Sequence, residues 1–185
     1  VAAADITQIE GDTNGTITVS NNINITGTAA EVAAAVADVN TFSGTPTATL
    51  SNAHNITQLI AINDALDGTL TLHDSTVNLS GTSAQVAAAL AGTFAAAYSG
   101  TATVSNAHTL AQLKTINNGT TGQITLNDSS VALEGSTADV KAALTGDFAA
   151  AYTGNVTLND ANGTGIAGTD ITQIEGDTNG TITVS

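Results

Sequence analysis

The chain has 185 residues, a formal net charge of −14 with two lysines and no arginine, and no Cys, Met or Trp. The missing cysteines exclude disulfide scaffolds, thiol catalysis and thiolate metal sites, and two cationic side chains cannot form the basic patch that nucleic acid requires. No apolar run reaches the roughly 20 residues of a membrane-spanning helix, so membrane insertion is not expected. The first residue, Val1, is not followed by a signal segment, and we interpret the sequence as a piece of a longer chain.

Internal repeats dominate the sequence. The segment 5–20, DITQIEGDTNGTITVS, recurs letter for letter at 170–185, an offset of 170 − 5 = 165 in the numbering. A looser period of about 54 residues relates three segments: INITGTAAEVAAAV at 23–36, VNLSGTSAQVAAAL at 77–90 and VALEGSTADVKAAL at 131–144. The strings ATLSNAH at 48–54 and ATVSNAH at 102–108 have the same spacing. Such periods are typical of proteins built from stacked structural units.

A helix start is predicted in each unit by the reciprocal capping pattern, in which Ser, Thr, Asn or Asp is followed three residues later by Gln, Glu or Asp. Five examples recur at one constant interval in the numbering (55 − 28 = 27): Thr28/Glu31, Asn55/Gln58, Thr82/Gln85, Thr109/Gln112 and Ser136/Asp139. Asp5/Gln8 and Asp170/Gln173 add two more, displaced by a shortened first unit and a seven-residue insertion near 161–168. The unit is therefore about 27 residues long.

Each unit is predicted to form a helix followed by one or two short strands. The units starting at 28, 82 and 136 are Ala-rich and predict a longer helix, such as one along 83–98. The units starting at 5, 55, 109 and 170 predict a shorter helix and a second strand. The stretches 68–74 and 75–81 read as two strands joined by a tight corner, and 101–106 as another strand.

Apolar residues and threonines alternate along these strands, which places them on opposite faces of a sheet. The apolar face contains Ile17, Val19, Leu70, Leu72, Val77, Leu79, Ile124, Leu126, Val156 and Leu158. The other face contains Thr16, Thr18, Thr69, Thr71, Thr101, Thr103, Thr125 and Thr157, with Gln123 and Asn155 interrupting the pattern. The five aromatic residues, expected in the core, lie late in the Ala-rich units: Phe42, Phe94, Tyr98, Phe148 and Tyr152.

These patterns predict an α/β repeat solenoid of about 27-residue helix–strand units, paired into about 54-residue repeats, with helices packed against a parallel β-sheet. The chain, 1–185, is then one segment of a longer array, with repeats at about 1–54, 55–108 and 109–168 and the next beginning at 169–185. The partners expected are adjacent repeats of the same array. Because the ends of such a stack expose strand edges, end-to-end self-association is also expected.

The strings LSGTSAQVAAAL, LEGSTADVKAAL and ITGTAAEVAAAV, with NAH-type helix starts and GTATVSN strands, resemble very large repeat proteins of bacteria. They are similar in particular to giant cell-surface proteins of marine cyanobacteria and other Gram-negative bacteria. The resemblance covers essentially the whole chain, but its motifs are low in complexity and carry over no functional residue. It implies an extracellular, array-forming role in adhesion, motility or the cell coat.

Candidate chemical sites are weak. The D-x-N-G turns of GDTNGT and NDANGTG resemble part of an oxygen-rich calcium loop, but the full loop pattern is absent, and an ordinary turn between a helix and a strand, where Asp, Asn and Gly are expected anyway, is the favoured interpretation. The calcium candidates are Glu10, Asp12, Asn14, Asp160, Asn162, Glu175, Asp177 and Asn179. His54 and His108 occupy equivalent repeat positions and His73 is isolated, so no zinc site is predicted. No nucleophile elbow or glycine-rich phosphate loop occurs, and no cofactor or enzyme activity is expected.

Two functional hypotheses follow. The first is a structural module of a large secreted or cell-surface protein, acting as a spacer, stalk or adhesive surface. The second is a repeat module that binds calcium or a crystalline surface such as ice, because stacked Thr-x-Thr strands would form a grid of hydroxyl and methyl groups with spacings of about 7 Å and 4.8 Å. The same grid would also serve merely to keep a β-face soluble.

Overall fold

The computed structural model describes residues 1–161 and 165–185. In this part of the chain, seven helices alternate with short parallel strands, so the predicted mixed α/β class and the parallel strand pairing are confirmed. The described residues group into two compact units. The first unit contains 1–77 and 91–99, and the second contains 78–90 and 100–185.

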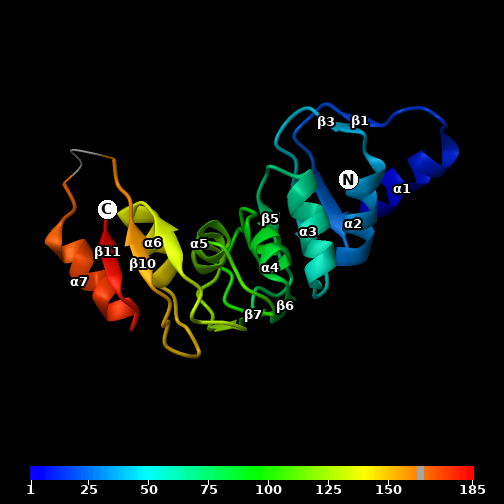
Figure 1. The fold of residues 1–185 in the computed structure, drawn as a ribbon. Coiled ribbons are helices and arrows are strands. Elements are labelled where there is room, and N and C mark those ends of the chain that lie inside the picture. The colour runs from blue at the N-terminus through cyan, green and yellow to red at the C-terminus, as the bar shows by residue number, and fades with distance from the viewer. Residues whose placement is uncertain (162–164) are drawn as a thin grey trace. The chain divides into compact units, whose positions relative to one another are not determined.

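The first unit has three helices that pack one after another: α1 (Ala3–Asp12), α2 (Ala29–Asp38) and α3 (Ile56–Ala65). They lie side by side in Figure 1. One sheet has the order β2 (Asn24–Gly27), β4 (Thr47–Leu50), β5 (Leu70–Thr71). A separate parallel pair consists of β1 (Thr18–Val19) and β3 (Thr41–Phe42). Helix α2 packs on β2 and β4, and Val32 of the helix and Ile25 and Ala48 of the strands are buried.

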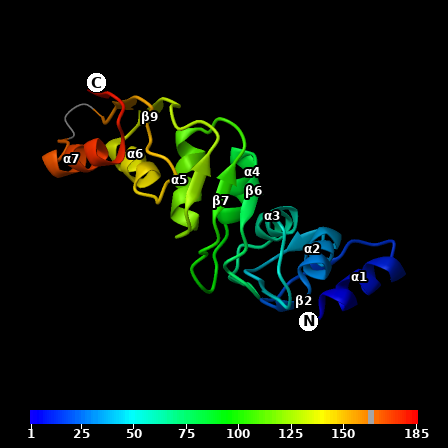
Figure 2. The same cartoon turned by 90° about the horizontal axis from the view of Figure 1, so that it is seen from below.

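The second unit repeats this arrangement with four helices: α4 (Ser83–Leu90), α5 (Leu110–Gly119), α6 (Thr137–Leu144) and α7 (Gly168–Asp177). Figure 2 shows α5, α6 and α7 following one another. One of its sheets has the order β6 (Leu79–Gly81), β7 (Ala102–Val104), β8 (Ile124–Leu126). The other has the order β11 (Ile182–Val184), β10 (Val156–Leu158), β9 (Leu133–Gly135). Helices α4 and α6 pack on these sheets.

The capping pattern locates five of the helix starts. Reciprocal boxes form at Thr28/Glu31, Asn55/Gln58, Thr82/Gln85 and Thr109/Gln112. At Ser136 the hydroxyl accepts from the Asp139 N–H, but the Asp139 carboxylate bonds the hydroxyl and not the backbone, because its side chain is one carbon shorter than that of Glu. The predictions at Asp5/Gln8 and Asp170/Gln173 are wrong. Those helices begin three residues earlier than predicted, with uncapped Ala N-caps, and the Asp residues lie in the first turn, where the helix dipole favours acidic groups.

The Ala-rich helices are not longer than the others, which corrects the length prediction. Helices α4 and α6 have eight residues, whereas α1, α2, α3, α5 and α7 have ten. A neighbouring segment stops α6: the Asn117 amide donates to the Ala142 carbonyl at 2.7 Å, and a Cβ at Gly146 would collide with Asn117 Oδ1. The following residues leave the helix, and Phe148 forms an isolated parallel bridge with Ile124.

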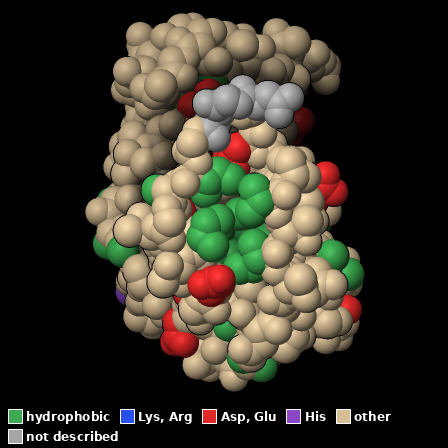
Figure 3. All heavy atoms as spheres, turned by 60° about the vertical axis from the view of Figure 1, so that its left-hand side comes forward, with side chains coloured by type: hydrophobic (Ala, Val, Ile, Leu, Met, Phe, Trp, Pro, Cys, Tyr) green, Lys and Arg blue, Asp and Glu red, His purple; other side chains and the backbone are tan. Residues whose placement is uncertain are grey.

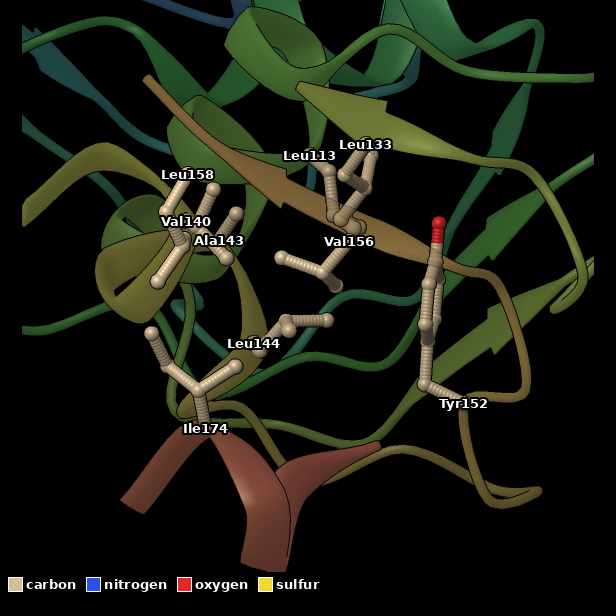
Figure 4. Close-up of a cluster of buried hydrophobic side chains, with 9 residues drawn as sticks. All are labelled: Leu113, Leu133, Val140, Ala143, Leu144, Tyr152, Val156, Leu158 and Ile174. Atoms are coloured by element: carbon tan, nitrogen blue, oxygen red, sulfur yellow. The ribbon is translucent and has the colours of Figure 1, made fainter. Parts of the chain in front are cut away.

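The predicted faces of the strands are confirmed in their main features. The apolar residues named in the prediction are buried or half-buried, and the threonines named in it are exposed apart from half-buried Thr157. Of the aromatic residues, Tyr98 and Tyr152 are fully buried, while Phe42, Phe94 and Phe148 are half-buried. In the second unit a cluster around Leu144, Val156 and Leu158 forms the core between α6, α7 and the sheet (Figure 4).

Candidate functional site

The acidic turns lie at the ends of α1 and α7. Glu10, Asp12 and Asn14 are exposed, as are Glu175 and Asn179 of the second turn. The predicted candidate Asn162 lies outside the described residues. Throughout 1–161 and 165–185, no three His, Asp or Glu side chains gather closely enough to hold a metal ion.

Asp177 differs from the other calcium candidates because its carboxylate is partly buried. Its Oδ2 atom is enclosed without a hydrogen-bond partner in the described structure. Burial raises the pKa of the Asp177 carboxyl, and a hydrogen bond from Gln173 acts in the opposite direction. This environment disfavours the charged form that would bind a cation.

Asp160, another candidate, caps a helix of the preceding segment. Its carboxylate accepts from the Thr137 N–H, the first of α6, at 3.1 Å and also from the Thr137 hydroxyl. Equivalent contacts occur one repeat and two repeats earlier in the chain: Asn106 Oδ1 accepts from the Ser83 N–H at 2.7 Å and Asn52 Oδ1 from the Ala29 N–H at 2.8 Å. The side chain at this repeat position (Asn52, Asn106 or Asp160) therefore accepts from the N-terminus of a helix that begins 23 positions earlier in the chain. The repeated SNAH string, which contains Asn52 and Asn106, is the sequence signal from which this capping role could have been predicted.

The most enclosed polar groups are two histidine–tyrosine pairs. His54 Nε2 lies 3.0 Å from the Tyr98 hydroxyl, which donates to the Val77 carbonyl at 2.6 Å. The second pair repeats these contacts at 2.9 and 2.6 Å: His108 Nε2 to Tyr152, and Tyr152 to the Val131 carbonyl. Because each hydroxyl proton is given to a carbonyl, each ring must donate from Nε2.

Electrostatics keep these rings neutral. Nδ1 of His54 and of His108 is buried without a hydrogen-bond partner in the described structure. Burial lowers the pKa of both rings, and a nearby carboxylate opposes it in each case, Asp74 for His54 and Asp128 for His108. Burial likewise raises the pKa of Tyr98. A neutral ring with one satisfied nitrogen is a structural element, and sequence reasoning missed the pairing because its members are 44 residues apart.

Both lysines of the chain join neighbouring helices of the second unit. Lys141 of α6 contacts Asp170 of α7 at 2.6 Å, and Lys114 of α5 contacts Asp139 of α6. The hydrogen bond from Lys114 lowers the pKa of Asp139. A groove of about 470 Å³ lies beside Lys141 and is lined by residues of α6 and α7 and of the segment between β10 and α7. Since Asp170 already neutralises Lys141, the groove offers no unpaired cation of its own among the described residues.

The threonine face consists of short rows. In the first unit Thr26, Thr49 and Thr71 are in register across three strands, and the Asn24 side chain bonds the Thr49 hydroxyl at 3.1 Å. The rows of the second unit contain a different residue at one edge: Ser80–Thr103–Thr125 and Glu134–Thr157–Thr183. Among the described residues the regular grid is therefore limited to at most three strands in a sheet.

Comparison of the chain with protein-family models, with curated protein sequences and with solved structures finds no match. Among the described helices, none combines the length and the apolarity that crossing a bilayer requires.

Proposed function

We propose that this chain is a structural repeat module of a large secreted or cell-surface protein, in which stacked helix–strand segments form a solenoid that serves as a spacer, a stalk or an adhesive surface. Adjacent repeats of the same array are its partners. Catalysis and cofactors form no part of the proposal.

The recurrence of one buried contact carries this proposal. Histidine and tyrosine are rare in the chain, with three and two residues respectively. Both tyrosines and two of the histidines are used in equivalent pairs that connect one segment to a carbonyl of another, through Val77 and Val131. A side chain that must satisfy a neighbour's backbone fixes the register between segments, as expected where stacking is the source of stability.

Two further sets of contacts support stacking. The amide or carboxylate of Asn52, Asn106 and Asp160 caps the helix of the preceding segment. The side-chain amide of Asn117 bonds the end of the next helix at Ala142. Helix termini are thus satisfied by neighbouring segments as well as locally, so one segment taken alone would leave backbone groups without partners.

Single-molecule stretching tests the proposed mechanical role. Because the chain lacks cysteine, handles can be attached through Val1→Cys and Ser185→Cys. A stacked array should release length in increments of one or two units, about 90–100 Å for each 27-residue unit at full extension. One all-or-none event that releases the whole length would contradict the proposal. The double variant Tyr98→Phe/Tyr152→Phe, as a control, should lower the force of these steps.

Thermal melting in excess EDTA and in millimolar calcium distinguishes the spacer from a calcium-binding module. A ligand that binds only the native state stabilises it by RT ln(1 + [L]/Kd) and so raises the melting temperature. The spacer predicts identical melts, and a rise of several degrees with calcium would favour the other hypothesis. Surface location is tested separately, by whether antibodies against the chain label intact, unpermeabilised cells.

A further inference from the structure

Each histidine–tyrosine pair joins three successive passes of the chain. In the first set, here called the first clasp, His54 lies directly before the N-cap of α3, Val77 lies between β5 and β6, and Tyr98 lies in the loop that follows α4. The second clasp has the equivalent residues His108, Val131 and Tyr152. Each clasp lies within one compact unit. A change at the histidine can therefore alter how three passes are held together.

The loop that carries the tyrosine is held by little besides the clasp. The first and last amides of the loop 95–99 donate to carbonyls of an earlier pass, at 3.0 and 2.8 Å. Of the side chains in this loop, Tyr98 is buried and the other four are exposed. The loop 149–153 has the same two bonds, at 2.9 and 2.8 Å, and the same pattern of exposure around Tyr152. Whatever weakens the hold on the tyrosine should loosen this loop first.

The histidine ring of each clasp has one nitrogen in use and one enclosed. Nε2 donates to the tyrosine hydroxyl, whose own proton goes to the backbone carbonyl, so the hydrogen bonds run in one direction from ring to backbone. Nδ1 is buried and has no partner among the described residues. His54 and His108 are only 5% and 4% exposed. A proton added to Nδ1 would put a charge and an unpaired donor in an enclosed site, and both are costly there.

A carboxylate near each ring is the acceptor available to a ring that leaves this site: Asp74 in the first clasp and Asp128 in the second. Hydrogen bonds from Thr76 lower the pKa of Asp74, and those from Ser130 lower the pKa of Asp128, so both stay charged in mild acid. The exposed His73 also acts on Asp74. Acidic side chains are exposed on the face shown in Figure 3, and a net charge of −14 likewise favours a positively charged ring.

We propose that both clasps are operated by acid: a proton from solvent, added at Nδ1, moves the histidine ring out of its enclosed site to the aspartate, breaks its bond to the tyrosine and loosens the loop 95–99 or 149–153. The bond from the tyrosine to the carbonyl remains, so the open clasp joins two passes of the chain in place of three. The inference rests on the proposed function, because acid then softens the stack that makes the chain a spacer.

The clasps should open as the pH falls from 7.5 to 5. Burial lowers the pKa of the ring in the closed clasp, and a ring that leaves the site recovers its ordinary value of 6.5, so the open state binds the proton more readily. At pH 5 a ring with that ordinary value has about 30 protonated forms for each neutral one. The equilibrium constant for opening should therefore rise by up to about thirtyfold over this range.

Amide hydrogen exchange followed by NMR tests the loosening of the loops. Protection factors, which correct for the intrinsic effect of pH on exchange, should fall by about tenfold or more at the amides of Ser99 and Thr153 between pH 7.5 and 5. The nuclear Overhauser contact between the rings of His54 and Tyr98, whose centroids are 5.8 Å apart, should weaken over the same range. Unchanged protection at both amides, or a ring contact that persists after the histidine has titrated, would overturn the proposal.

Two variants of the first clasp separate the effect of the proton from a merely structural one. His54→Gln keeps a neutral donor for the tyrosine hydroxyl but cannot be protonated, so protection at Ser99 should no longer depend on pH. Tyr98→Phe removes the hydroxyl and should leave protection at Ser99 low at both pH values. The unaltered second clasp is the control within the same molecule, and Thr153 should keep its full pH dependence. Loss of that dependence at Thr153 as well would point to global unfolding and contradict the proposal.

Asp74→Asn tests where the ring goes. The asparagine Oδ1 can still accept from the N–H and the hydroxyl of Thr76, as the aspartate does at 2.8 and 2.7 Å, so the turn should keep its shape. The pH at which Ser99 loses protection should move to a more acidic value, while that of Thr153 stays the same. An unchanged midpoint at Ser99 would contradict the proposed movement. Failure of these pH effects would leave the stretching steps at neutral pH, and so the proposed function, unaffected.

Discussion

The 16-residue segment occurs twice, as a first copy at 5–20 and a second copy at 170–185. The two copies share every side chain and differ only in the residues that pack against them. Ile9 is 55% exposed and Ile174 is 0% exposed, although both are the fifth residue of their copy. Helix length and turn geometry are nevertheless the same in both copies. The comparison separates two layers of information: local interactions determine the helix and the turn, and neighbouring segments determine burial and hence stability.

Ile174→Ala should have the largest effect, because it empties a fully buried position. Truncation of a buried Ile typically costs about 2–5 kcal/mol, so the α7–β11 segment should lose that much unfolding free energy. The matched Ile9→Ala should change stability by no more than about 0.5 kcal/mol. Urea unfolding of both variants checks this, and equal losses would show that the two copies are packed alike.

Thr178→Val should have the next largest effect. The Thr178 hydroxyl donates to the Gly154 carbonyl and accepts from the Gly180 N–H, and its residue is buried, so its loss leaves enclosed backbone groups unpaired at a cost of about 1–3 kcal/mol. In the first copy Thr13 is exposed, and its hydroxyl accepts from the Gly15 N–H, which can turn to water. Thr13→Val should therefore be the milder change in parallel urea titrations.

Unlike the two copies of the 16-residue segment, the two histidine–tyrosine pairs have equivalent surroundings and should respond to pH alike. Burial lowers the pKa of His54 and His108 in the folded state, so the unfolded chain binds more protons below the ordinary value of 6.5. Stability should therefore fall as the pH drops below 6.5 toward the lowered folded-state pKa. Unfolding at pH 7.5 and 5 should show this loss, and His54→Gln with His108→Gln should diminish it. A stability that rises toward pH 5 would contradict the enclosed, neutral rings.

Asp177→Asn should have the smallest effect and the opposite sign. Burial raises the pKa of Asp177, so the charged carboxylate is disfavoured in the folded state. Its replacement should stabilise the chain at pH 7 by up to about 0.5 kcal/mol, and this gain should vanish in acid as the carboxyl of the unmodified chain becomes protonated. Asp12→Asn, at the exposed position of the first copy, should show no such gain.

The sequence predicted features that depend on residues close together in the chain. The boxes at Thr28, Asn55, Thr82 and Thr109 need only a partner three residues away, and the alternation of Thr with Ile or Leu needs only the geometry of a strand. The Asp5 pattern failed because the same spacing also occurs inside the first turn of a helix. A capping box therefore requires knowledge of where the helix begins.

Contacts between residues far apart in the chain could not be predicted from such local patterns. The end of α6 depends on Asn117, which comes from the preceding helix, and propensity alone favoured a longer helix along the alanines. The Tyr98 hydroxyl meets His54 across 44 residues, a pairing that requires the stacking register in advance. The residues within the two copies cannot indicate which side chains are buried, because the two strings are identical and their surroundings differ.

Residue-resolved hydrogen exchange by NMR can show whether neighbouring segments, and not the local sequence, determine the protection of each copy. The Asn179 N–H donates to the Tyr152 carbonyl at 2.8 Å, whereas its equivalent Asn14 has no such partner in the described part of the chain. Conversely, the Ile17 N–H donates to Asn40 Oδ1 at 2.7 Å, whereas strand alternation directs the Ile182 N–H to the outer edge of β11. We expect slow exchange at Asn179 and Ile17 and fast exchange at Asn14 and Ile182. The same order of protection in both copies would contradict it.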